Sequence, residues 1–150
     1  ENSDEPYCEE LAKAITNEIR RGNRIDTTTK LRNVIEKTLD FLPNNKEKKD
    51  IIKKTCQRTF QALRIDVNNE FEVLYEFMDK LPGALKPGGR VAILTFHSGE
   101  DKLVKKALKA GYKEGIYSEY ARDVVRPSAQ ECAQNGRARS TKMRWAVKAE

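Results

Sequence analysis

LKPGGRVAILTFHSGEDKLVKK, residues 85–106, is the stretch that decides the fold of this chain. The Pro-Gly-Gly triplet at 87–89 predicts a helix end and a turn, because proline cannot continue a helix and glycine permits positive φ. Arg90–Phe96 is a short apolar run bounded by turn signals, which predicts a strand buried on both faces, as in a parallel sheet. Ser98, with Asp101 three residues later, predicts the N-cap of a following helix.

The carboxyl end of the predicted strand is the first place to look for a binding site. Ligands of open α/β sheets bind at that end of the strands. Phe96 and His97 lie there, and they could stack on a flat ring or hydrogen-bond to it. The alternative is that Phe96 belongs to the core and His97 is a hydrogen-bonded strand end. Glu100 and Asp101 are either an acid/base or cation-binding pair, or acids that complement a helix dipole.

The composition excludes several classes of protein. A chain of 150 residues, 38% hydrophobic and 35% charged, can form one globular domain with a real core. No run approaches the roughly 18 apolar residues of a membrane span, and the acidic N-terminus does not resemble a signal peptide. The three cysteines lack CxxC or Cys/His spacing, so we expect reduced thiols in a cytosolic-type compartment and no zinc site.

The formal net charge is +6, and its distribution suggests a partner. Residues 134–148 contain no acid and five basic residues: Arg137, Arg139, Lys142, Arg144 and Lys148. A second basic cluster covers 46–54. Such clusters suit a phosphate backbone, although a solvated surface is the alternative, favoured for 46–54.

The rest of the chain predicts a helical part followed by an α/β part. Residues 7–21 and 29–42 have helical periodicity, 46–55 suggests a short helix or connector, and 66–85 suggests a long amphipathic helix. The inner face of that last helix is expected to hold Val67, Phe71, Leu74, Phe77, Met78 and Leu81. After the central strand we expect a helix over 99–110 ended by Gly111, one strand within 112–125, a short helix to 134 and a closing strand over 140–148.

This order predicts the α/β fold class, as the second half of a doubly wound sheet. We expect a helical subdomain over 1–57, an insert suited to RNA or substrate recognition, and the α/β part over 58–150. The glycine-rich turn that follows the first strand of a complete nucleotide-binding domain is missing from the sequence.

Three segments together resemble one family. They are RTFQALRI at 58–65 with Asn-Asn-Glu at 68–70, TFHSGED at 95–101, and NGRARSTKMR at 135–144. The chain is similar to the RsmH or MraW family of S-adenosylmethionine-dependent methyltransferases, which modify cytosine N4 in small-subunit ribosomal RNA. Two positions depart from the family pattern: Gly99 replaces a usual leucine and Gly136 a usual proline.

The resemblance implies roles for particular residues and partners. It implies a class I methyltransferase fold, ribosomal RNA in the small subunit as substrate, and a location in the cytoplasm, or in an organelle if the source is eukaryotic. The implied catalytic residues are Phe96, His97, Ser98 and Glu100. The implied RNA-binding residues are Arg58, Gln61, Arg64, Arg137, Arg139, Lys142 and Arg144. For the three on 58–64, anchoring of the helical subdomain is the alternative.

The cofactor loop, the acidic ribose contact and much of the cofactor pocket would lie in an N-terminal half that this sequence lacks. We therefore expect a fragment, a chain completed by another chain, or a relative that no longer binds cofactor. The competing functions are a methyltransferase, a non-catalytic RNA- or ribosome-binding module, and a generic nucleic-acid-binding α/β domain. An exposed sheet edge would favour a homodimer or pairing with the missing half.

Overall fold

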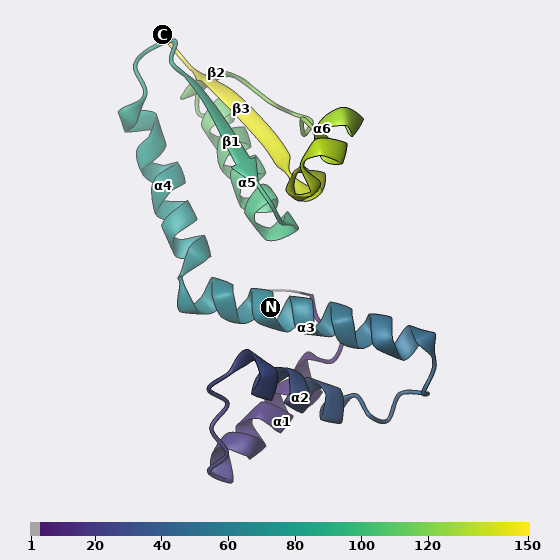
Figure 1. Ribbon diagram of the computed structural model, residues 1–150. Helices are drawn as coiled ribbons and strands as arrows, with labels where there is room; N and C mark the ends of the chain where they lie inside the picture. Colours follow the sequence, from purple (N-terminus) through teal and green to yellow (C-terminus); the bar gives the residue numbers. More distant parts are fainter. Residues whose placement is uncertain (1–3) are drawn as a thin grey trace. The chain divides into compact units, whose positions relative to one another are not determined.

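The computed structural model describes residues 4–150, whose helices and strands are drawn in Figure 1. The chain divides into two compact units, Glu1–Asn68 and Asn69–Glu150. Helix α3, Lys46–Val67, runs through the division that the sequence suggested after residue 57. Among residues 4–150, no helix combines the length and the apolar character that crossing a membrane requires.

The first unit is helical. It consists of α1 (Cys8–Arg20), α2 (Thr28–Thr38) and α3. Its core is an aliphatic cluster contributed by the first two helices and the turn that follows them: Leu11, Leu31, Ile35 and Leu39. Polar caps fix where the helices begin, because the Thr27 side chain accepts a hydrogen bond from the Lys30 amide and Asn45 accepts one from the Lys48 amide. The two predicted N-terminal helices are therefore confirmed.

Helix α3 is longer than the sequence suggested. The expected short helix or connector over 46–55 is wrong, since one helix of 22 residues covers Lys46–Val67. The expected start of the next helix at Asp66 is also wrong. Helix α3 ends at Val67, and Asn69 has φ 49° in the left-handed region that asparagine tolerates. The two helices are therefore separate elements on either side of Asn68 and Asn69.

The second unit combines helices with a small sheet. It contains α4 (Glu70–Ala84), β1 (Arg90–Thr95), α5 (Ser98–Lys113), β2 (Tyr117–Tyr120), α6 (Ala129–Gln134), the 3-10 turn η1 (Gly136–Ser140) and β3 (Lys142–Lys148). The strand order is β1-β3-β2, and both pairs are antiparallel. In Figure 1 helix α5 lies along the sheet, and side chains of α4, α5 and the sheet share one core. The predicted closing strand is confirmed.

Strand β1 is not buried on both faces. Val91 and Ile93 pack against the shared core, whereas Ala92 is exposed and Leu94 is 57% exposed on the other face. The pairing is antiparallel, with Thr95 opposite Lys142, rather than parallel as the apolar run indicated. The run is apolar on both faces although residues 4–150 cover only one of them.

Two details of the helices also differ from expectation. Gly111 does not end α5 but lies inside it, and a Cβ there would come within 2.6 Å of the Tyr117 ring. The expected inner face over 66–85 is only partly right. Met78 and Leu81 are buried, but Val67 is 78% exposed and Phe77 is 46% exposed. Val67 does not share the inner face of α4 because it is the last residue of α3, which is a separate helix.

Candidate active site

The junction between β1 and α5 is a reciprocal cap built on His97. Its Nδ1 accepts a hydrogen bond from the Glu100 amide at 3.4 Å. The Glu100 carboxylate in turn accepts from the amides of Phe96 at 2.9 Å and His97 at 3.4 Å. His97 is thus the N-cap and Glu100 the N3 residue, whereas the sequence suggested Ser98 and Asp101. Ser98 is the first residue of α5 and is exposed.

Asp101 forms an ion pair with Arg144 rather than a cap. Arg144 Nε lies 2.7 Å from Asp101 Oδ1 and Nη2 lies 3.2 Å from Oδ2, a two-pronged contact. Arg144 Nη1 also donates to the carbonyl of Arg122 at 3.2 Å. The Arg144 guanidinium holds the pKa of Asp101 below its usual value. Arg144 is 5% exposed, so its predicted role as a phosphate contact does not fit its place inside the unit.

Glu70 joins His97 and Glu100 in a compact polar cluster. Each of the three residues offers one nitrogen or oxygen atom, and these atoms lie within 4.8 Å of one another. The imidazole packs edge-on against the Phe71 ring, with centroids 5.9 Å apart. Glu70 is the first residue of α4, so two helix starts meet at this cluster. In the sequence, Glu70 stands out only as part of the Asn-Asn-Glu segment at 68–70, which does not by itself indicate a place in the site.

The cap determines which imidazole nitrogen carries the proton. Nδ1 accepts from an amide, so the neutral ring carries its hydrogen on Nε2, which is buried and lies 3.4 Å from Glu100 Oε1. A metal ion on Nε2 would need the other tautomer, with the Nδ1 hydrogen pressed against the Glu100 amide hydrogen. The arrangement therefore suits hydrogen bonding to a polar ligand better than metal coordination.

Phe96 gives the cluster an exposed aromatic neighbour. Its side chain is 55% exposed, although it lies directly beside the capped junction. Core packing therefore does not account for an aromatic residue at this position. An exposed ring next to a hydrogen-bonding cluster is the arrangement that a flat polar ring, such as a nucleobase, would require.

The predicted basic residues fall in two places. In the second unit, Arg137 and Arg139 are exposed on η1, and Lys142 Nζ lies 4.0 Å from Asp101 Oδ2. Lys142 also pairs with Thr95 across β1 and β3, so it lies near the end of β1 that carries Phe96. These basic groups and the capped junction belong to the same unit.

The other three predicted RNA contacts belong to α3, in the first unit. Arg58 lies 3.6 Å from the carboxylate of Glu5, which also accepts a hydrogen bond from Thr55. This contact supports an anchoring role for Arg58, because it ties the segment before α1 to α3. Gln61 is half-buried on the same helix and Arg64 is exposed.

Comparison with known proteins identifies the family. A sequence model described as the MraW methylase family matches residues 1–149. The chain belongs to this family. The resemblance carried by 58–70, 95–101 and 135–144 is therefore confirmed. The matched residues include the junction between β1 and α5 and the two basic clusters, 46–54 and 134–148.

Curated relatives of the family are closely similar over the whole chain. The chain is 88% identical over 150 residues to "Ribosomal RNA small subunit methyltransferase H 1" of Agathobacter rectalis, covering 100% of this chain and 43% of that protein. It is 71% identical over 149 residues to the protein of the same name from Lachnoclostridium phytofermentans, covering 99% and 40%. "Ribosomal RNA small subunit methyltransferase H 2" of Alkaliphilus metalliredigens is 58% identical, with 99% and 42% covered. The chain thus spans about two-fifths of the length of these relatives.

Proposed function

We propose that this chain is part of an enzyme that transfers a methyl group from S-adenosylmethionine to cytosine N4 of small-subunit ribosomal RNA. Family membership and the names of the curated relatives support the reaction class and the RNA. The observation that carries the proposal is the exposed Phe96 beside the His97, Glu100 and Glu70 cluster. Such an enzyme would work in the cytoplasm, together with the ribosomal subunits that are its proposed substrate.

The described residues do not fit the cofactor. S-adenosylmethionine carries a positive sulfonium, whereas the cavity in the first unit is lined by the cationic side chains of Lys49 and Lys53. The adjacent glycines Gly88 and Gly89 precede β1 instead of following it, so they do not form a nucleotide-binding turn. We therefore assign no cofactor contact to residues 4–150.

The sheet supports a larger fold. Among residues 4–150, β1 pairs with β3 on one edge and with no strand on the other. Its outward residues Ala92 and Leu94 are exposed, which an apolar strand in a complete doubly wound domain would not be. We propose that further strands pair with β1 to complete a class I methyltransferase sheet. The helical part is an RNA-recognition insert, and an N-terminal half or a second copy covers the edge.

The cluster at the end of β1 can recognise the edge of a cytosine. The 4-amino group donates hydrogen bonds and N3 accepts one, so a carboxylate beside an imidazole N–H matches both. Glu70 would accept from the amino group beside Glu100, whose carboxylate caps the helix, and His97 Nε2 would donate to N3 after a small opening of the buried site. Phe96 would stack on the ring, and Ser98 would border it.

A carboxylate at the amino group also serves the chemistry. The nitrogen lone pair is delocalised into the ring, so N4 is a weak nucleophile and must lose a proton when its new bond to carbon forms. A carboxylate held against N4–H orients the nitrogen and accepts that proton. Exposed Arg137 and Arg139, with Lys142, would contact phosphates of the same strand.

The product identifies the reaction. The full-length protein would be incubated with S-adenosylmethionine and unmethylated small ribosomal subunits, and the RNA would be digested to nucleosides. Chromatography coupled to mass spectrometry is expected to show N4-methylcytidine, in an amount that corresponds to a single residue in each RNA molecule. A methyl group on cytosine C5, on another base or on ribose would overturn the assignment, and so would the absence of methylation.

A further inference from the structure

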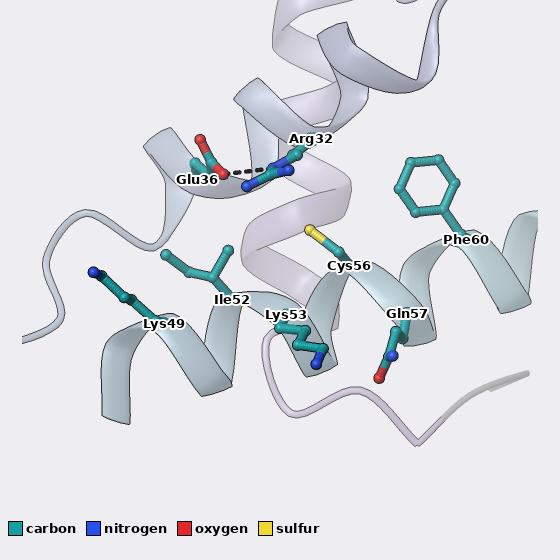
Figure 2. A pocket seen from close by; sticks show the side chains of 8 residues that line it. All are labelled: Arg32, Glu36, Lys49, Ile52, Lys53, Cys56, Gln57 and Phe60. Carbon is teal, nitrogen blue, oxygen red and sulfur yellow. Dashed lines mark hydrogen bonds and ion pairs between the residues drawn. The ribbon is translucent and has the colours of Figure 1, made fainter. Parts of the chain in front are cut away.

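A cavity of about 850 Å³ in the first unit has no role in the site described above. It lies between α2 and α3, and Figure 2 shows its lining side chains. The residues are Arg32 and Glu36 from α2, and Lys49, Ile52, Lys53, Cys56, Gln57 and Phe60 from α3. Its size is within the range of about 300–1,000 Å³ that is usual for small-ligand sites.

The floor of the cavity is apolar. Ile52, Cys56 and Phe60 pack against the core of the unit and are half-buried. In Figure 2 the Cys56 sulfur points toward α2, with the Phe60 ring at one end of the cavity and Lys49 at the other. Burial raises the pKa of the Cys56 thiol, so this sulfur stays neutral and adds no negative charge to the floor.

The rim of the cavity is cationic. Lys49, Lys53 and Arg32 are exposed, and among the lining residues that the structure describes Glu36 is the only acid. Glu36 Oε1 lies 2.7 Å from Arg32 Nε, which fixes the guanidinium plane and leaves its outer nitrogens available. Phe60 supplies an aromatic ring, Gln57 an amide, and Lys49 and Lys53 two ammonium groups that form no ion pair with any residue from 4 to 150. Around one apolar floor, these groups suit a ligand with a flat ring and a phosphate.

We propose that this cavity holds an unpaired nucleotide of the RNA substrate, away from the base that is methylated. The base would stack on Phe60, Gln57 would hydrogen-bond to its edge, and Lys49 and Lys53 would contact its phosphates. Stacking and phosphate contacts tolerate any base, so the site favours single-stranded RNA with little sequence preference. This inference rests on the proposed function, because that function supplies RNA as the partner.

Alkylation of Cys56 tests the proposal on the unmodified protein. The full-length protein would be treated with iodoacetamide, with and without a saturating short oligouridylate, and each cysteine would be followed by mass spectrometry. RNA in the cavity should slow alkylation of Cys56 several-fold. Cys8, exposed and outside the cavity, is the internal control and should react at an unchanged rate. Equal Cys56 rates with and without RNA would overturn the proposal, as would equal protection by an RNA duplex.

Variants give a second readout. Phe60→Leu should weaken oligouridylate binding roughly five- to tenfold, because it removes a stacking ring. The double variant Lys49→Gln, Lys53→Gln should lower the slope of log affinity against log salt concentration by about 1.4. The single variant Lys54→Gln, at an exposed lysine outside the cavity lining, should lower that slope by at most half as much. If the lysine pair gives only the same change as Lys54→Gln, the cavity has no special role.

The two proposals can fail separately. Methylated small-subunit RNA without protection of Cys56 would reject the cavity and leave the reaction standing. Protection of Cys56 without any methylation would reject the reaction and keep RNA binding.

Discussion

At the scale of single residues, Gly99 and Phe71 form a matched pair. A Cβ on Gly99 would lie 2.7 Å from Phe71 Cζ and 3.2 Å from His97 Cε1. The leucine that the family usually has here therefore finds its space already filled by Phe71. We predict that Gly99→Leu destabilises the protein by about 1–3 kcal/mol through overpacking, in spite of the roughly 1 kcal/mol that leucine gains in a helix. Urea unfolding would measure the difference.

The double variant separates this clash from other effects. In a Phe71→Ala background the space is free, so adding Gly99→Leu should be neutral or stabilising. The two changes would then be strongly non-additive. Equal costs of Gly99→Leu in both backgrounds would show that Phe71 is not the obstacle.

The Asp101–Arg144 pair predicts a dependence of stability on pH. The folded pKa of Asp101 lies below its unfolded value of about 3.9, so its stabilising contribution is present above that value and is lost as the pH falls through the folded pKa. Asp101→Asn leaves a buried guanidinium without its charge partner, which costs about 3 kcal/mol or more at neutral pH. The difference in the free energy of unfolding between wild type and variant should become smaller below about pH 4. A gap that stays constant in urea unfolding down to pH 3 would contradict this.

The sequence located the junction between β1 and α5 but exchanged the capping roles of its residues. Ser98 and Asp101 match the usual capping signals, and histidine is an unusual N-cap. The pattern could not show that Asp101 has a buried arginine 43 positions later in the chain. For the same reason, Arg144 looked like one more basic residue of an exposed strand. The sequence did not predict that Glu70 lies beside His97 and Glu100, because these residues belong to another element.

At the scale of elements, Gly111 lets β2 approach α5. A Cβ would lie 2.6 Å from Tyr117 Cε2, and Tyr117 is buried in the core. Gly111→Ala should therefore destabilise by about 1–3 kcal/mol. Gly83→Ala is the matched control in α4, where nothing lies within 4 Å of the new Cβ. It should be neutral or stabilising by up to about 1 kcal/mol, as helix propensity alone predicts. The same response at both sites would rule out the contact with Tyr117.

Gly136 opens η1 at a position that accepts proline. Asn135 before it has φ −129° and ψ 97°, which suits a residue that precedes proline, and nothing lies within 4 Å of a new Cβ. Gly136→Pro should stabilise by about 0.4–1 kcal/mol by restricting the unfolded chain. Gly115→Pro, at φ 75°, should instead destabilise. Thermal unfolding of both variants would check the contrast, and a loss of stability in Gly136→Pro would contradict it.

Element boundaries were predictable where caps and periodicity agree. The α2 and β3 segments came directly from apolar spacing, although α2 ends at Thr38 and not at residue 42. Helix α3 was not predictable in this way, because some of its apolar residues line a cavity. In addition, two polar residues of the helix, Thr55 and Thr59, are buried. Buried hydroxyls and a half-exposed apolar floor blur the helical period that the sequence can show.

At the scale of the whole molecule, the sequence carried the family and the order of the elements. Three motifs far apart in the chain gave the family, and the comparisons confirmed it. The apolar sequence of β1 did not predict that one face of this strand is exposed in the described residues. An apolar run indicates burial, but it does not indicate which chain or segment provides the cover.

The most direct test of the account is the rate of methyl transfer by the full-length protein carrying Glu70→Gln. The amide keeps the size of the side chain but cannot accept the proton that N4 releases. We expect kcat on small ribosomal subunits to fall roughly 100-fold or more, with KM little changed and urea unfolding at the wild-type midpoint. Lys109→Gln, on the exposed face of α5, is the control and should keep the wild-type rate. A wild-type kcat in Glu70→Gln would contradict the claim that the end of β1 and its neighbouring carboxylates hold the reacting cytosine.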